Sequence, residues 1–160
     1  MSYFSIKLKS MKKIFLIIVL IGAGYTSQAQ TATDSVKAVI DQLFTAMRNA
    51  DSATIVNCFS ENHILQTLVR DKEGNMHAKT DKVTDFGHNI GSLPKNAADE
   101  RITYAAVNVD GPLASVWTPY KFYFNGNFSH CGVNSFQLIR SKQGWKIHYL
   151  VDTRRKDACE

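Results

Sequence analysis

The side chains of this chain that could do chemistry lie mainly in its last third, from Val116 to Arg155. Histidine titrates near neutrality, so His130 could act as a general base. Asn134 carries an amide that could orient a bound molecule. The rings of Trp117 and Tyr149 could form the walls of a pocket. These residues are candidates for a small-molecule site.

Other kinds of site find little support. His130 and Cys131 are adjacent on an expected strand, so their side chains point to opposite faces and do not form a nucleophile and base pair. No two histidines stand three to five residues apart and no Cys-x-x-Cys occurs, so we expect neither a metal site nor a cofactor. The glycines lack the spacing of a phosphate-binding loop. Asp152 lies on the outward register, although a bulge near the strand end could turn it inward.

The first 29 residues have the pattern of a secretory signal peptide. A lysine-rich start precedes an apolar run from Ile14 to Ala23, and the small residues Ser27 and Ala29 form a cleavage motif. The run is shorter than the roughly 20 apolar residues that a membrane-spanning helix needs, and no second run follows it. We therefore expect cleavage after Ala29 and export to the bacterial periplasm or beyond, with no membrane span in the mature chain, residues 30–160.

The charge of the mature chain argues against a nucleic-acid partner. The full sequence has 19 basic and 14 acidic residues, a formal net charge of +5. Four of the basic residues precede Gln30, so the mature chain has 15 basic and 14 acidic residues and a net charge of +1. Nucleic-acid binding calls for a basic face with many phosphate contacts. The length of residues 30–160 suits a single domain with its own core.

The sequence contains three cysteines, so at least one is unpaired within a monomer. Cys131 and Cys159 could form a disulfide if the C-terminal tail folds back, and an exported chain permits this. The spacing of the two residues does not demand it. Cys58 follows a helical segment and reads as a small buried hydrophobe.

Hydrophobic periodicity predicts three helices in the first half of the mature chain, at about 33–47, 51–61 and 81–93. Thr33 is the expected cap of the first helix, Thr80 or Asp81 caps the third, and Pro94 stops it. Residues 64–79 are expected to form a hairpin around the turn 71–75. The expected inward positions are Val36, Val39, Ile40, Leu43, Phe44 and Met47 in the first helix, Ala53, Ile55, Val56 and Phe59 in the second, and Val83, Phe86, Ile90 and Leu93 in the third.

Four strands are predicted to follow, at 101–109, 113–124, 128–140 and 145–153. The turns between them are Asp110-Gly111-Pro112, Asn125-Gly126 and Gln143-Gly144, and each offers a glycine where positive φ is needed. Such short links make neighbouring strands antiparallel. The second half of the chain is therefore expected to be a four-stranded meander.

The register of the last two strands decides which side chains face the interior. Pairing Leu138 with Ile147 places one set of side chains on the buried face: His130, Asn134, Phe136, Trp145, Tyr149 and Val151. The preceding strand has two possible registers. A two-residue turn at Asn125-Gly126 places Trp117 beside Asn134, on the interior face. A three-residue turn would place Tyr120 on that face instead. The Asn-Gly pair favours the two-residue turn, and both aromatic residues stay candidates.

This order of elements, with the closing segment Gly144-Trp145-Lys146-Ile147, resembles the nuclear transport factor 2-like superfamily. The segments Trp117-Thr118-Pro119-Tyr120 and His130-Cys131-Gly132-Val133-Asn134 are similar to those of its exported bacterial members, the SnoaL-like and lumazine-binding-like proteins. The resemblance spans residues 33–155. It implies an α+β fold in which a cone-shaped curved antiparallel sheet packs on three N-terminal helices, and it implies a homodimer. The superfamily includes isomerases, dehydratases, cyclases, hydrolases and plain binding domains, so the fold does not carry the function.

We expect the cone to enclose a pocket for a small apolar or aromatic molecule. The predicted pocket residues are His63, Trp117, Tyr120, His130, Asn134, Phe136 and Tyr149. One alternative is a proton-transfer enzyme of the dehydratase, cyclase or isomerase type with His130 as general base, which requires a carboxylate or a tyrosine hydroxyl within hydrogen-bond reach of that ring. Another is a homodimeric protein-interaction module whose exposed sheet face pairs with a partner. The simplest interpretation makes His130 a structural histidine and the aromatic residues part of the core.

Overall fold

The computed structural model describes residues 27–159. The chain divides into two compact units, residues 1–32 and residues 33–160. The predicted signal peptide falls in the first unit, and all but its last three residues lie outside the described part. Among the described residues, no helix is both long enough and apolar enough to cross a membrane.

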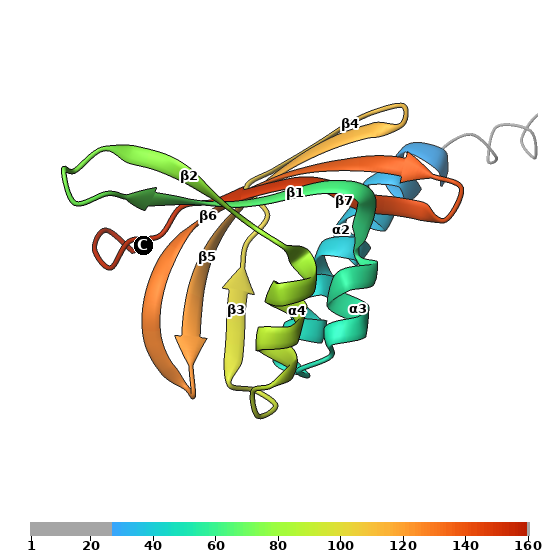
Figure 1. The fold of residues 1–160 in the computed structure, drawn as a ribbon. Helices are drawn as coiled ribbons and strands as arrows, with labels where there is room; N and C mark the ends of the chain where they lie inside the picture. The colour runs from blue at the N-terminus through green and yellow to red at the C-terminus, as the bar shows by residue number, and fades with distance from the viewer. Residues whose placement is uncertain (1–26, 160) are drawn as a thin grey trace, which may run out of the picture. The chain divides into compact units, whose positions relative to one another are not determined.

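The second unit has the predicted α+β architecture, with helices packed against a curved seven-stranded sheet (Figure 1). The helices are α2 (Ser27–Arg48), of which residues 33–48 belong to this unit, α3 (Ser52–Asn57) and α4 (Val83–Gly91). The strands are β1 (Phe59–Arg70), β2 (Met76–Asp81), β3 (Ala98–Ile102), β4 (Ala106–Asp110), β5 (Leu113–Phe124), β6 (Asn127–Ser141) and β7 (Gly144–Asp152).

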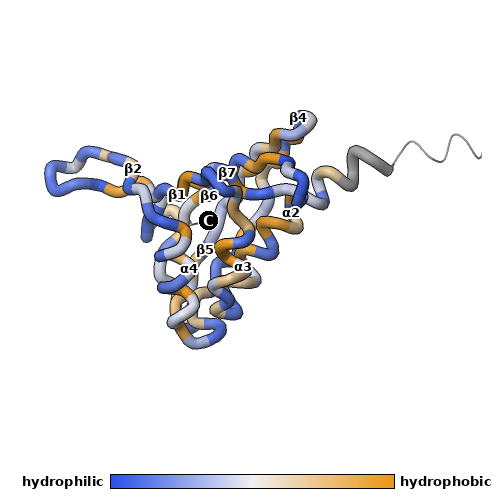
Figure 2. The backbone as a smooth tube through the Cα atoms, turned by 45° about the vertical axis from the view of Figure 1, so that its right-hand side comes forward, coloured by the Kyte–Doolittle hydropathy of each residue, from blue (hydrophilic) through white to orange (hydrophobic). Residues whose placement is uncertain are grey.

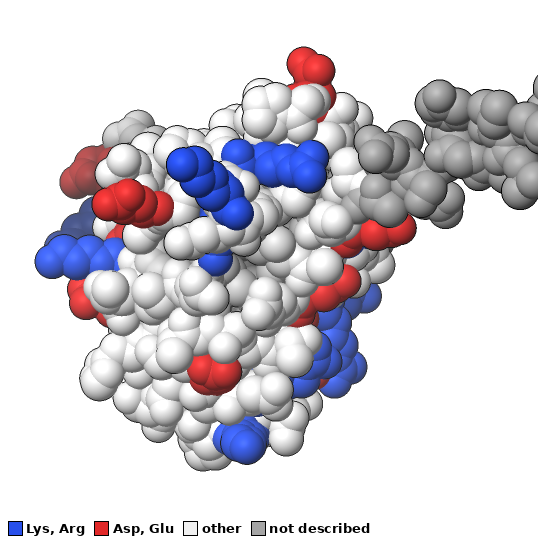
Figure 3. Space-filling model, turned by 90° about the vertical axis from the view of Figure 1, so that its right-hand side faces the viewer, with Lys and Arg blue, Asp and Glu red and all other residues white. Residues whose placement is uncertain are grey.

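The strands follow the order β2-β1-β7-β6-β5-β3, and β4 also pairs with β5. The pairing of β1 with β7 is parallel, whereas the other pairings are antiparallel. The turn between β1 and β2 is hydrophilic, and hydrophobic residues gather where α2 faces the sheet (Figure 2). Acidic and basic side chains are interspersed on the face shown in Figure 3.

The core lies between α2 and the sheet, as the periodicity predicted. Val36, Ile40, Leu43, Phe44 and Met47 of α2 are all buried. The helix begins at Ser27, so Thr33 lies inside it and is not its cap. No glycine or proline separates the two positions, which allows the helix to extend upstream.

The predicted second helix, residues 51–61, is too long. Asp51 caps α3, since its side chain accepts a hydrogen bond from the Thr54 amide, but the helix ends at Asn57. Phe59 already belongs to β1 and pairs with Ile147 of β7, so sheet pairing replaces the expected last helical turn. Ala53, a predicted inward position, is exposed.

The start of α4 and the predicted strand 101–109 also differ from the prediction. Neither Thr80 nor Asp81 caps α4, because both pair with β1 and extend β2; Lys82 takes the N-cap position. The predicted strand 101–109 is two strands, β3 and β4, interrupted opposite Pro119. The Thr103 amide donates to the Pro119 carbonyl at 2.9 Å, but proline has no N–H to return a bond, so the ladder is incomplete there.

A β-bulge changes the register between β5 and β6. The predicted two-residue turn is present, with Asn125 and Gly126 at φ values of 50° and 78° and Phe124 opposite Asn127. The bulge then leaves Ser129 without a cross-strand partner in β5, so the register shifts by one residue beyond Tyr123 and Phe128. The turn therefore follows the two-residue prediction, while the rest of β5 presents the face expected for the three-residue turn.

A second bulge lies between β6 and β7. Leu138 pairs with Ile147, as predicted, but Gln137 pairs with Tyr149, and His148 between them has no cross-strand partner in β6. A one-residue shift exchanges the two faces of a strand. Leu150 and Asp152 therefore face the interior, where the uninterrupted register would have placed Tyr149 and Val151.

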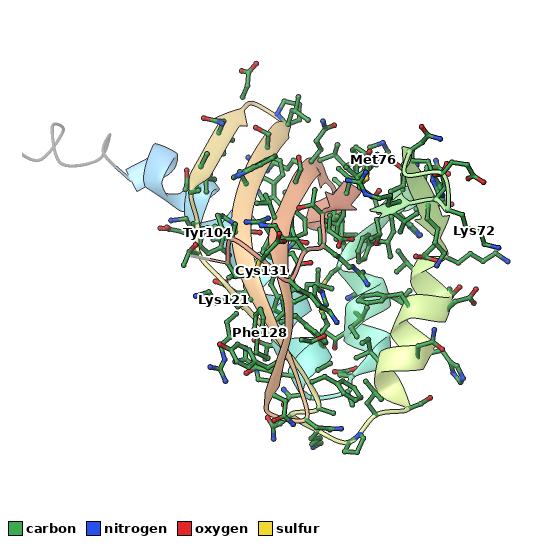
Figure 4. All side chains as sticks on the ribbon, turned by 90° about the vertical axis from the view of Figure 1, so that its left-hand side faces the viewer. Lys72, Met76, Tyr104, Lys121, Phe128 and Cys131 are labelled. Carbon is green, nitrogen blue, oxygen red and sulfur yellow. A yellow bond between two sulfur atoms is a disulfide. The ribbon has the colours of Figure 1, made fainter. Side chains whose placement is uncertain are left out.

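Beyond β7 the chain continues beside β6 in the same antiparallel register. Cys131 forms an isolated antiparallel bridge with Arg155 and a disulfide with Cys159. Cys131 lies beside Lys121 on the outer face of the sheet (Figure 4). Cys58 is free and buried. The structure thus contains the disulfide that the sequence permitted.

Candidate functional site

Four buried polar side chains form one row across the concave face of the sheet. They are Thr67, Asp152, Asn134 and Thr118, each at most 7% exposed. They occupy neighbouring positions on four adjacent strands, because Thr67 pairs with Asp152, Asp152 with Asn134, and Asn134 with Thr118. Directly paired residues point to the same face of a sheet. We call these four residues the polar row.

A cavity of about 310 Å³ lies between the polar row and the helices. Its apolar wall comes mainly from α2 and α4, and its polar wall comes mainly from the sheet. The residues that line it are Leu43, Phe44, Met47, Leu65, Thr67, Lys79, Asp81, Asp85, Phe86, Asn89, Ile90, Glu100, Tyr120, Phe122, His130, Asn134, Leu150, Asp152 and Arg154. A cavity with a broad apolar surface and a few convergent polar groups is typical of a small-molecule site.

Glu100 brings a carboxyl group into this cavity from β3. The Asn134 Nδ2 donates a hydrogen bond to Glu100 Oε1 at 2.7 Å. Burial raises the pKa of Glu100 to about 7, and the Asp152 carboxylate adds to the rise, while the bond from Asn134 and the charge of Arg154 oppose it. The group can therefore give or take a proton near neutral pH.

Asp152 has a different environment, although it lines the same cavity. The Thr67 hydroxyl donates to Oδ1 at 2.6 Å, and Arg154 Nε donates to Oδ2 at 2.8 Å. The guanidinium also donates from Nη2 to Thr67 Oγ1 at 3.2 Å. Asp152 is thus ion-paired with Arg154. Glu100 instead accepts a hydrogen bond from the neutral amide of Asn134. The two carboxyl groups of the cavity therefore lie in unlike surroundings, a pattern that acid–base sites often show.

Tyr120 closes one end of the polar wall. Its hydroxyl lies 2.9 Å from the Thr153 carbonyl and 3.4 Å from Asp152 Oδ2, and the single proton is best placed on the shorter bond. Burial raises the pKa of Tyr120 well above its ordinary value, with further rises from Glu100 and Asp152. Tyr120 is therefore a neutral side chain that holds the backbone of Thr153.

His130 lies on the cavity wall, and in the described part of the chain its hydrogen-bond partner is Ser129 and not a carboxylate. Its Nδ1 is 3.1 Å from Ser129 Oγ, and its ring packs against the rings of Tyr120 and Phe122, with centroids 5.7 and 5.0 Å away. Burial lowers the pKa of His130, and the charge of Arg154 lowers it further. The general-base hypothesis required a carboxylate or a tyrosine hydroxyl in hydrogen-bond contact with this ring. Its hydrogen-bond partner is a serine, so Glu100 is the better candidate for proton transfer.

Of the seven predicted pocket residues, Tyr120, His130 and Asn134 line the cavity. Trp117 does not, because the bulge at Ser129 turns it to the outer face, where it is 48% exposed. Tyr149 does not either, because the bulge at His148 turns it outward.

Tyr149 pairs with Gln137, and its hydroxyl donates to Gln66 Oε1 at 2.8 Å. Asn134 and Tyr149 thus lie on opposite faces, and the prediction that they share one was wrong.

The two remaining predicted residues lie in other surroundings. Phe136 is fully buried and packs edge-on against Phe44, with ring centroids 6.2 Å apart, so it belongs to the core. His63 lies in β1, where Nδ1 is 2.7 Å from the Ser60 carbonyl and the ring packs against Phe59. Both have structural partners that explain their positions.

The sequence analysis missed Glu100, Thr67 and Arg154, and placed Asp152 outward. Glu100 lies between residues 95–99, which the sequence predicts to be a polar linker, and the predicted start of the next strand at Arg101. One signal was present, since Ala98, Glu100 and Ile102 alternate in the strand pattern and put a carboxylate between two apolar positions. Asp152 became interior only through the bulge at His148.

Comparison with known proteins gives the fold and no activity. The sequence matches no family model, and no curated protein matches it. Solved structures do match. A nuclear transport factor 2-like protein of unknown function from Shewanella baltica is 13% identical with a TM-score of 0.61, and the match covers 82% of this chain and 99% of that one.

Two further structures agree. A domain of unknown function with a cystatin-like fold from Nostoc punctiforme is 17% identical with a TM-score of 0.63, over 83% of this chain and 82% of that one. A ketosteroid isomerase-like protein from Erwinia carotovora is 13% identical with a TM-score of 0.56, over 76% and 95%. The element order, the curved sheet and these matches together show that the chain has the nuclear transport factor 2-like fold.

Proposed function

We propose that this chain is an exported domain that binds a small, largely apolar or aromatic molecule in the cavity between α2, α4 and the polar row. The observation that carries the proposal is the division of the cavity wall. Side chains such as Phe44, Phe86 and Ile90 offer an apolar surface, and Glu100 with Asn134 offers one polar anchor. A ligand with an apolar body and one hydrogen-bonding group fits both walls.

Export is part of this proposal. The N-terminal sequence has the features of a signal peptide, and disulfides persist mainly in oxidising compartments such as the bacterial periplasm. The disulfide between Cys131 and Cys159 supports the same placement.

Native mass spectrometry of the protein purified from its own cell envelope tests the binding proposal. We expect a retained small molecule that denaturation releases. In the variant Ile90→Trp, a larger ring on the cavity wall should abolish retention. The matched control His88→Trp makes a bulky change at an exposed position of the same helix and should retain the molecule. A wild-type protein without a bound molecule, or equal retention in Ile90→Trp, would contradict the proposal.

A second candidate function is proton-transfer catalysis of the isomerase, dehydratase or cyclase type, with Glu100 as the acid–base group. The raised pKa of Glu100 favours it, because a group with a pKa near 7 can both donate and accept a proton at physiological pH. In this case Glu100→Gln, which cannot transfer the proton, should accumulate a different bound molecule from the wild type. Identical molecules at equal occupancy in the two proteins would rule catalysis by Glu100 out.

We further propose that the chain forms a homodimer through the outer face of the sheet. Trp117 is 48% exposed there, and Val133, Tyr149 and Val151 are partly buried around it. A contiguous apolar patch on a sheet face, rather than a single exposed ring, is what marks an interaction surface, and these four residues together form such a patch. Light scattering after size exclusion should give a dimer for the wild type and a monomer for Trp117→Glu. A monomeric wild type would contradict this part of the proposal.

A further inference from the structure

The C-terminal tail is fastened to the sheet at several points. We call residues 153–159 the C-terminal strap. The Thr153 amide donates to the Val133 carbonyl at 3.1 Å, and the Arg155 and Cys131 amides each donate to the other residue's carbonyl at 2.9 Å. The disulfide to Cys159 fixes the far end of the strap to the same strand, β6.

Gly132 shows how closely the strap approaches the cavity wall. A Cβ atom at this position would lie 1.8 Å from the Thr153 carbonyl oxygen and 2.8 Å from a ring carbon of Tyr120. The strap's backbone therefore occupies the space that a side chain would need. The Tyr120 hydroxyl donates to that same carbonyl, so a cavity-lining residue holds the start of the strap.

The side chain that the strap contributes to the cavity is Arg154. Its guanidinium donates to Asp152 Oδ2 and Thr67 Oγ1 and so joins two members of the polar row. The other basic residue of the cavity lining, Lys79, is ion-paired with Asp81 at 2.8 Å. Among the described residues, Arg154 is therefore the basic residue that forms an ion pair with Asp152, the carboxylate of the polar row.

We propose that Arg154 is a positioning residue of the cavity and that the Cys131–Cys159 disulfide is the latch that keeps it there. The inference goes beyond the proposed binding function, because it concerns the cavity itself and holds whatever molecule the cavity takes. Arg154 acts on Asp152 and Glu100, which in turn would meet a ligand.

Apart from the disulfide, few contacts hold the end of the strap against the sheet. Residues 154–158 are exposed, and beyond Thr153 the backbone is attached through one isolated bridge between Arg155 and Cys131. A chain end attached in this way opens locally at a much lower free-energy cost than the core strands. With the disulfide intact, the strap is a closed loop and not a free end. Once a dithiol reductant converts the disulfide to two thiols and is itself oxidised to a disulfide, the strap can open and carry Arg154 away.

Loss of Arg154 from the cavity should change the pKa values of Glu100 and His130 in a definite direction. The titratable groups around it are Glu100 on β3, Tyr120 on β5, His130 on β6 and Asp152 on β7, with Lys156 on the strap; Lys79, Asp81 and Asp85 line the same cavity from β2 and α4. The positive charge of Arg154 lowers the pKa of both Glu100 and His130. Loss of this charge from the cavity therefore raises both pKa values.

NMR titration of the full chain tests the proposal through the Glu100 carboxyl carbon and the His130 ring, with amide exchange at Arg155 as the reporter of the strap. Reduction by a dithiol should raise both midpoints by roughly half a pH unit and speed exchange at Arg155 by roughly tenfold or more. Cys159→Ser should show both effects without reductant and no further change with it. Arg154→Gln with the disulfide intact should raise both midpoints and leave the exchange at Arg155 slow.

Three results would overturn the proposal. Unchanged midpoints in Arg154→Gln would mean that Arg154 does not set the charge state of the cavity. Unchanged midpoints after reduction, with the shift still present in Arg154→Gln, would mean that Arg154 stays in place without the latch. Global unfolding on reduction would mean that the disulfide supports the whole fold, although the core contains no strap residue.

Discussion

Replacement of Glu100 by glutamine should stabilise the protein at neutral and alkaline pH. The change removes the charge of the buried carboxyl group and keeps Oε1 as an acceptor for Asn134. Burial raises the pKa of Glu100 from 4.5 to about 7 in the folded state. Between these values the folded chain holds a proton that the unfolded chain has released, so wild-type stability falls as the pH rises through this window. At roughly 1.4 kcal/mol for each pH unit, the full loss is about 3 kcal/mol above pH 7.

Urea denaturation at pH 5, 6, 7 and 8 measures this effect. The free energies of unfolding of Glu100→Gln and wild type should agree within about 1 kcal/mol at pH 5, and the variant should be more stable by about 3 kcal/mol at pH 8. The control Glu73→Gln makes the same chemical change at an exposed residue in the turn between β1 and β2 and should show little pH-dependent gain. A Glu100→Gln variant no more stable than wild type at pH 8 would refute the reasoning, because the carboxylate would then carry no burial cost.

Three further substitutions test the polar row and the strap. Thr67→Val removes the hydroxyl that donates to Asp152 and should lower the free energy of unfolding by about 1–3 kcal/mol; an unchanged midpoint in urea would mean that the buried carboxylate does not need this donor. Gly132→Ala should cost about 1–3 kcal/mol or more, because its Cβ would overlap the Thr153 carbonyl; a neutral effect would place the strap elsewhere. Thr118→Val removes a buried hydroxyl for which the described residues offer no hydrogen-bond partner, and it should be neutral or stabilising by about 1 kcal/mol; clear destabilisation would show that the hydroxyl is hydrogen-bonded.

Much of the fold could be predicted because local patterns determine it. The helical stripe of α2 and the Asn125-Gly126 turn need no knowledge of distant contacts, and both are present. The boundaries that were wrong depend on pairing between distant segments. Phe59 leaves the predicted helix because it pairs with Ile147, and Thr80 leaves the expected cap position because it pairs with Gln66.

The site was harder to predict because two single-residue bulges decide it. Strand alternation assigns faces only while the register is unbroken. The unpaired residues Ser129 and His148 each reverse the assignment partway along a strand, and neither is a glycine or proline that would mark a bulge in the sequence. Trp117 and Tyr149 were consequently assigned to the wrong face, and Asp152 was left outside the cavity.

A crystal structure of the protein purified from the organism that makes it, with its disulfide intact, tests the central claim most directly. The account predicts density for a small molecule between α4 and the polar row, with one of its polar atoms within hydrogen-bond distance of Glu100 or Asn134. A Glu100 side chain turned to bulk water, with the cavity filled by the protein's own side chains, would contradict it.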